Sequence, residues 1–166
     1  MQPTAIEGMF IMGFIELHQI QFQILAYVGL AMLLGAAIGL EREIEDKPAG
    51  LRTHMLVAGA AALLVALGDV VVRRFDVGLG KELVRSDPVR IIEAVITGVS
   101  FLGAGTIIQR STSRQVEGLT TAASILFVAA VGVCVALSQL VLAVGVTVLV
   151  LIILRGVGFV QHRLEQ

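Results

Sequence analysis

The sequence predicts an all-α membrane protein, a polytopic bundle of about five transmembrane helices. The mean hydropathy is +0.93, hydrophobic residues make up 57% of the chain, and charged residues make up only 15%. The charges gather in short blocks between long apolar runs, a pattern typical of membrane proteins and not of soluble domains. The net charge of -1 predicts neither a nucleic-acid-binding surface nor an acidic tail, so we expect no nucleic-acid partner.

The first 21 residues are too polar to span a membrane. Glu7, Glu16 and several other polar residues interrupt their apolar side chains, so we expect an interfacial helix over 1–21 that lies along the bilayer. The first basic residue is Arg42, and a segment without a positive start argues against a cleaved signal peptide.

Five apolar runs then predict the transmembrane domain, over residues 22–160, with a short tail at 161–166. Polar breaks separate the runs, which cover residues 22–40, 55–72, 89–108, 118–137 and 140–160. A helix of 18–20 residues, at about 1.5 Å per residue, crosses a hydrocarbon core of about 30 Å. Pro88, directly after Ser86 and Asp87, marks the start of the third helix.

Basic residues near the ends of the runs predict the orientation. Arg42, Lys47 and Arg52 follow the first run, whereas its N-terminal side carries no Lys or Arg. Because basic residues favour the cytoplasmic side, we expect the N-terminus outside and the C-terminus in the cytoplasm. The loop at 73–90 also holds five basic residues, and this orientation places it outside.

The chain contains an internal repeat. With a shift of 68 residues, 34–66 aligns with 102–134 without gaps, and the matches include Arg42 with Arg110 and Thr53 with Thr121. Each copy is a helix rich in small residues, a polar loop, and a helix that opens with Gly-Leu-x-Thr. Two crossings separate the copies, so we expect parallel hairpin repeats. Convergence of two hairpins under the same packing demands is the alternative.

Small residues recur where helices are expected to pack closely. Such residues let helix backbones approach each other, within one chain or across a homodimer. The glycines that we expect to serve packing are Gly35, Gly39, Gly98, Gly103 and Gly105.

Charged residues beside the first loop suggest a polar site. Glu41, Arg42 and Arg52 directly adjoin apolar runs, and a carboxylate can pair with a guanidinium across the hairpin. A structural ion pair and a binding site are both open. His54 is interpreted as a residue of the membrane boundary and not as a metal ligand.

Two carboxylates lie inside apolar runs. Asp69 and Glu93 both fall near the outer ends of their helices and could be neighbours. A carboxylate in hydrocarbon is costly and often functional, and oxygen ligands suit a hard divalent cation such as Mg²⁺. The alternative is that both reach interfacial water. No other cofactor is expected.

Soluble-type catalysis has no residue constellation here. The sequence holds no Walker loop, no Gly-x-Ser-x-Gly elbow and no His-Glu-x-x-His motif. The single Cys134 lies in an apolar run, where an inert buried thiol is expected. We therefore expect no enzymatic activity.

Four blocks resemble the MgtC/SapB family of membrane proteins. They are Gly39-Leu40-Glu41-Arg42-Glu43, Ala49-Gly50-Leu51-Arg52-Thr53-His54, Phe101-Leu102-Gly103-Ala104-Gly105-Thr106 and Gly118-Leu119-Thr120-Thr121-Ala122-Ala123, in the family's order and spacing. Ser100 and Leu126 depart from the family's usual glycine and tryptophan. Many members add an ACT-like C-terminal domain, which we do not expect in this chain.

The resemblance implies a bacterial inner-membrane protein of magnesium or acid-stress homeostasis, with a role in survival inside host cells and virulence. It implies a regulator of another membrane protein, such as the proton-driven ATP synthase. The partners that we expect are the lipid bilayer, that membrane protein and a second copy of the chain, in a homo-oligomer for which a dimer is favoured. A cation transporter or channel for Mg²⁺ or H⁺ is the alternative. The polar positions that the motifs carry over are Glu41, Arg42, Arg52, Thr53, Thr120 and Thr121.

Overall fold

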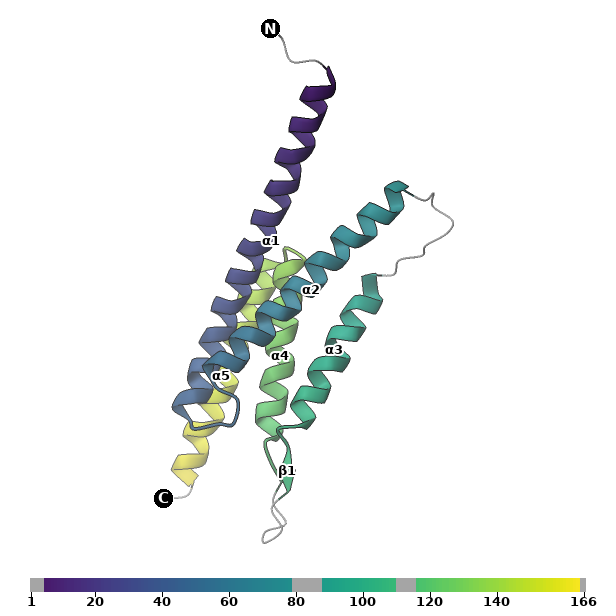
Figure 1. The fold of residues 1–166 in the computed structure, drawn as a ribbon. Helices are drawn as coiled ribbons and strands as arrows, with labels where there is room; N and C mark the ends of the chain where they lie inside the picture. Colours follow the sequence, from purple (N-terminus) through teal and green to yellow (C-terminus); the bar gives the residue numbers. More distant parts are fainter. Residues whose placement is uncertain (1–4, 79–87, 110–115, 165–166) are drawn as a thin grey trace.

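The computed structural model describes residues 5–78, 88–109 and 116–164, which are mostly helical. The helices are α1 Ala5–Ile44, α2 Leu51–Gly78, α3 Pro88–Ala104, α4 Leu119–Ala136 and α5 Leu140–Leu164. Beyond α3, the strands β1 Ile108–Gln109 and β2 Val116–Glu117 form a two-residue antiparallel ladder. Consecutive helices run in opposite directions, so α1, α3 and α5 point one way and α2 and α4 the other (Figure 1). The predicted all-α bundle is confirmed.

The helices have the length and surface of membrane spans. Three segments are long and apolar enough to cross a bilayer, and Leu140–Gly156 is a shorter apolar helix; the three are His18–Ile44, Leu51–Val72 and Leu119–Ala136. The 17 residues of α3 extend about 25 Å. Large apolar side chains face outward, among them Phe101 at 84% and Val141 at 90% exposure. Such uncovered surface suits lipid and not water.

The boundaries differ from the predicted ones at several places; α2, for example, covers Leu51–Gly78, whereas the predicted run covers 55–72. α1 is one uninterrupted helix through residue 21, where the sequence suggested a change from an interfacial to a spanning segment. How its first part lies relative to a bilayer stays a prediction. α3 ends at Ala104, four residues earlier than expected, because a turn closed by the Thr106 N–H and the Gly103 carbonyl leads into the β-ladder. α5 continues into the predicted tail, as far as Leu164.

The predicted break between the last two helices is confirmed. α4 ends at Ala136 and α5 begins at Leu140. Between them Ser138 adopts a left-handed backbone conformation, with φ at 60°, and its N–H donates to the Val135 carbonyl. Two separate helices therefore form where one long apolar run was the alternative.

The core lies where α2 packs between α1 and α4. Its buried side chains are small, with Ala58, Ala62 and Val128 fully covered. Gly132 of α4 faces the Ala58 backbone of α2, so that a Cβ at this position would collide with the Ala58 carbonyl. Close backbone approach, and not large interlocking side chains, joins these helices.

The repeat is visible in the packing. Gly35 of α1 faces His54 of α2, and the residues 68 positions later, Gly103 and Ala122, face each other between α3 and α4. The second helix of each copy begins at a leucine that follows a glycine, at Leu51 and Leu119. The two copies point the same way, as expected for parallel repeats (Figure 1). Arg110, the partner of Arg42 in the alignment, lies outside the described residues.

The glycines do not all pack as predicted. Gly35, Gly39 and Gly103 each face another helix of the chain. Gly98 of α3 has nothing within 4 Å of its virtual Cβ, and the Cβ position of Gly105 faces only the carbonyls of its own turn. Packing by Gly98 and Gly105 within one chain is therefore wrong, whereas packing of Gly98 between two copies stays a prediction.

Gly35→Val is expected to destabilise the bundle, because a Cβ at this position would lie 2.7 Å from the His54 carbonyl oxygen and 2.9 Å from the Ala58 Cβ. Overpacking of this kind typically costs about 1–3 kcal/mol. Thermal unfolding in detergent measures the effect, and Gly98→Val is the matched control. Equal unfolding temperatures for the two variants would contradict the packing described here.

Candidate functional site

Buried polar side chains gather at one end of the bundle, where α1 ends and where α2 and α4 begin. Glu41, Arg42, His54, Thr121 and Ser124 are each at most 3% exposed. Among the described side chains, every buried polar atom of this kind has a hydrogen-bond partner. We call these five residues the polar layer.

Glu41 and Arg42 form a buried ion pair within the polar layer. The Arg42 Nε donates to one Glu41 carboxylate oxygen at 2.5 Å, and a terminal guanidinium nitrogen donates to the other at 2.6 Å. This two-point geometry is the strong form of the interaction, because both charges are satisfied at once. The ion pair joins neighbours in the sequence and not residues across the hairpin, as the sequence had allowed, and Arg52 is exposed.

The loop between α1 and α2 is held by a neighbouring carboxylate. The Glu43 carboxylate accepts a hydrogen bond of 2.7 Å from the Leu51 N–H, one of the free donors at the start of α2. A Cβ at Gly50 would lie 2.7 Å from the same Glu43 oxygen, so a larger residue there would displace this carboxylate. The start of α2 is thereby fixed relative to the end of α1.

His54 connects α2 to α4. It is fully buried, its Nδ1 lies 2.9 Å from the Gly50 carbonyl oxygen, and its Nε2 lies 3.0 Å from the Ser124 hydroxyl. The Ser124 hydroxyl is also 2.9 Å from the Thr121 carbonyl, one turn earlier on α4. The interpretation of His54 as a boundary residue missed this role. Its place one turn into a helix, on the same face as the buried Ala58, was the available signal.

The remaining predicted positions divide between the interior and the surface. Thr121 is buried and Thr53 is half-buried, whereas Arg52 and Thr120 are exposed. Arg52 and Thr120 correspond under the 68-residue shift, and each is the second residue of its helix. The exposed pair therefore lies at the same end of the bundle as the polar layer.

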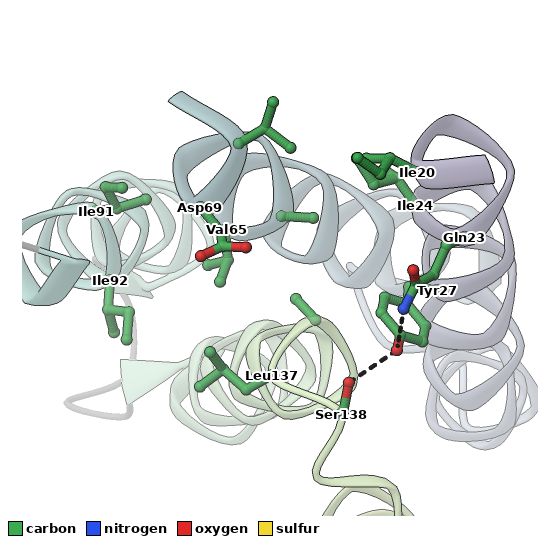
Figure 2. Close-up of a pocket in the computed structure, with 13 residues that line it drawn as sticks. Ile20, Gln23, Ile24, Tyr27, Val65, Asp69, Ile91, Ile92, Leu137 and Ser138 are labelled. Atoms are coloured by element: carbon green, nitrogen blue, oxygen red, sulfur yellow. Dashed lines mark hydrogen bonds between the residues drawn. The ribbon is translucent and has the colours of Figure 1, made fainter. Parts of the chain in front are cut away.

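A cavity of about 490 Å³ lies away from the polar layer, against the end of α4. Its walls come from α1, α2, α3 and the α4–α5 turn, and they are mostly apolar, with Asp69 on one side (Figure 2). Tyr27 and Ser138 close another side through a 2.8 Å hydrogen bond between their hydroxyls, and the Gln23 amide donates to the Tyr27 oxygen at 2.9 Å.

The two carboxylates expected to share a cation occupy different surroundings. Asp69 lines the cavity, together with Ile91 and Ile92 of α3, whereas Glu93 does not. Both carboxylates belong to exposed residues. Within the described ranges, no group of three or more His, Cys, Asp or Glu residues is arranged to hold a metal ion. A shared Mg²⁺ site would need further oxygen ligands.

These features define a polytopic helical membrane protein with a buried polar layer at one end. The family model described as the MgtC family matches residues 28–163, so the chain belongs to the MgtC family, as the sequence motifs predicted.

Several curated proteins are similar to the chain. Protein MgtC of Salmonella typhimurium is 35% identical over 137 residues, which cover 82% of this chain and 53% of that protein. The Escherichia coli protein named "Putative magnesium transporter YhiD" is 38% identical over 126 residues, with 76% and 56% covered. Protein SapB of Bacillus subtilis is 37% identical over 109 residues, with 66% and 45% covered. The chain thus spans about half the length of these relatives. No solved structure matches it.

Removal of one partner from the Glu41–Arg42 pair is expected to destabilise the fold, because it leaves a buried charge uncompensated. Glu41→Gln is expected to lower the free energy of unfolding by about 3–5 kcal/mol. The double change Glu41→Gln with Arg42→Gln is expected to recover part of this loss. Unfolding in detergent provides the double-mutant cycle.

The exposed Glu45→Gln serves as the control for this cycle and should unfold like the parent. If Glu41→Gln unfolded like Glu45→Gln, the ion pair would not contribute to stability.

Proposed function

We propose that this protein acts in magnesium or acid-stress homeostasis as a regulator of another membrane protein. In this proposal it resides in the bacterial inner membrane as a homo-oligomer, most simply a dimer, with the N-terminus outside and the C-terminus in the cytoplasm. The polar layer then faces the cytoplasm. Membership of the MgtC family supports the setting, and the name of the YhiD relative supports the link to magnesium.

The contrast between the interior and the surface of the polar end carries the proposal. The buried ion pair and the His54–Ser124 hydrogen bond are satisfied inside the chain. Arg52, beside them, is exposed at the start of α2. A rigid interior that presents a guanidinium outward suits recognition of an acidic group on a partner, because Arg can bind a carboxylate at two points.

The partner is proposed to be a membrane protein that handles ions, and the proton-driven ATP synthase is one candidate. Arg52 and Thr120 would contact it, since they are exposed at equivalent positions of the two repeats. Thr53 and the buried members of the polar layer would support that surface from within.

A second candidate function is transport of a cation by the protein itself. The cavity beside Asp69 favours it, because a carboxylate at the wall of a mostly apolar cavity attracts cations. In this case Asp69 and Glu93 would form an entry for Mg²⁺ or H⁺, each at a different point of the path.

Arg52→Ala is expected to abolish function while leaving the fold and membrane insertion intact, because the side chain is exposed. Growth at limiting magnesium, in a strain that lacks its own family member, measures function, and membrane fractionation measures insertion. Lys47→Ala is the matched control, since it removes an exposed positive charge from the loop that precedes α2. Wild-type growth of Arg52→Ala would remove Arg52 from the site.

Flux measurements separate the two candidate functions. Proteoliposomes of the purified chain are expected to show no more Mg²⁺ or proton flux than empty vesicles if the protein is a regulator. Flux that Glu93→Gln or Asp69→Asn abolishes would instead establish transport and refute the regulator.

A further inference from the structure

The hydrogen bonds around His54 restrict where its protons can lie. The imidazole is fully buried, and each of its two nitrogens faces one oxygen atom. A neutral imidazole carries one N–H donor and one acceptor, whereas the charged form carries two donors. Whether each of the two oxygen atoms donates or accepts therefore determines whether the nitrogen that it faces carries a proton.

The Nδ1 atom must carry a proton. Its partner at 2.9 Å is the Gly50 carbonyl oxygen, which can only accept, and that oxygen also accepts the His54 backbone N–H at 3.2 Å. The neutral ring is thus restricted to the tautomer protonated at Nδ1, because the hydrogen bond at one nitrogen sets the proton at the other.

The Nε2 atom faces a group that can reverse its role. The Ser124 hydroxyl lies 3.0 Å from Nε2 and 2.9 Å from the Thr121 carbonyl oxygen, and it has one proton to donate. If that proton points to Nε2, the imidazole is neutral. If it points to the Thr121 carbonyl, the hydroxyl oxygen is free to accept, and Nε2–H completes a charged imidazolium.

We propose that His54 is a proton-binding site, which takes up one proton at Nε2 and releases it again while the His54–Ser124 hydrogen bond persists. Uptake adds one N–H bond at Nε2 and turns the Ser124 proton from His54 to the Thr121 carbonyl. Release reverses both changes and returns the proton to water. The two end states have the same helix arrangement, because both use the same heavy-atom positions.

The charges around His54 are balanced before a proton binds. From α1, the ion-paired Glu41 and Arg42 act on His54 with opposite signs. Glu43, also at the end of α1, lies by Gly50 and accepts from the Leu51 N–H, and Arg52 on α2 itself is exposed. α4 carries no Asp, Glu, Lys, Arg or His between Leu119 and Ala136. A bound proton therefore adds one uncompensated positive charge beside Glu41.

Proton binding at His54 does not depend on whether the protein regulates another protein or transports an ion. It does assign a single titrating group to the contact between α2 and α4. A partner or an ion near the polar layer would experience a different charge in the two states.

Nitrogen-15 NMR of labelled histidine, on the full chain in lipid vesicles, tests the proposal. The variant His18→Gln with His162→Gln leaves His54 as the single histidine without altering the polar layer. At pH 8.5 the ring is expected to be protonated at Nδ1 and unprotonated at Nε2. At pH 5 both nitrogens are expected to be protonated, with one reversible transition between.

Substitution of the hydroxyl shows whether the transition depends on Ser124. In this background, Ser124→Ala removes the acceptor of the charged Nε2–H, and charge-assisted hydrogen bonds are about twice as strong as neutral ones. Half-protonation of His54 is expected to require an about tenfold higher proton concentration than in the parent. Ser100→Ala, an exposed serine of α3, should leave the transition unchanged.

Three results would overturn the proposal: a neutral ring protonated at Nε2, a ring that takes up no second proton between pH 8.5 and 5, or equal transitions in Ser124→Ala and Ser100→Ala. The first two are read from the variant that keeps the polar layer intact. They remain decisive even if Ser124→Ala fails to fold.

Discussion

The close approach of helix backbones is the constraint on which the rest of the structure depends. Gly35 and Gly39 bring α1 against the first turns of α2, and Gly132 brings α4 against α2 at Ala58 and Ala61. In lipid, no hydrophobic effect draws apolar helices together, so short-range packing has to supply the association. Larger side chains at these glycines would separate the three helices and expose the polar groups between them.

The polar layer follows from that approach. Once α2 is held between α1 and α4, His54 is fully buried and lies within hydrogen-bonding distance of Ser124. Glu41 and Arg42 are tolerated in the interior because each satisfies the other at two points. Membrane proteins tolerate such groups where they are paired inside the bundle, and the exposed surface around them stays apolar.

The sequence predicted the parts of the fold that depend on local pattern. Apolar runs separated by polar breaks located all five helices, because backbone groups in lipid must be satisfied within each helix. The repeat was visible in matched positions such as Thr53 and Thr121. The partner of Arg42 and the burial of His54 depend on rotamers and on the distance between helices, which hydropathy does not encode. Gly98 shows the same limit, because a small residue does not reveal which surface it faces.

The odd number of helices determines where material beyond α5 would emerge. α1 begins at one end of the bundle, and α5 ends at the other, the end that also carries the loop between α1 and α2 (Figure 1). Any polypeptide fused behind Leu164 would therefore leave the bilayer on the same side as Arg52. In longer proteins of the family, such as the relatives of which the aligned region covers only 53% and 56%, such a segment could cover or present that guanidinium without crossing the membrane.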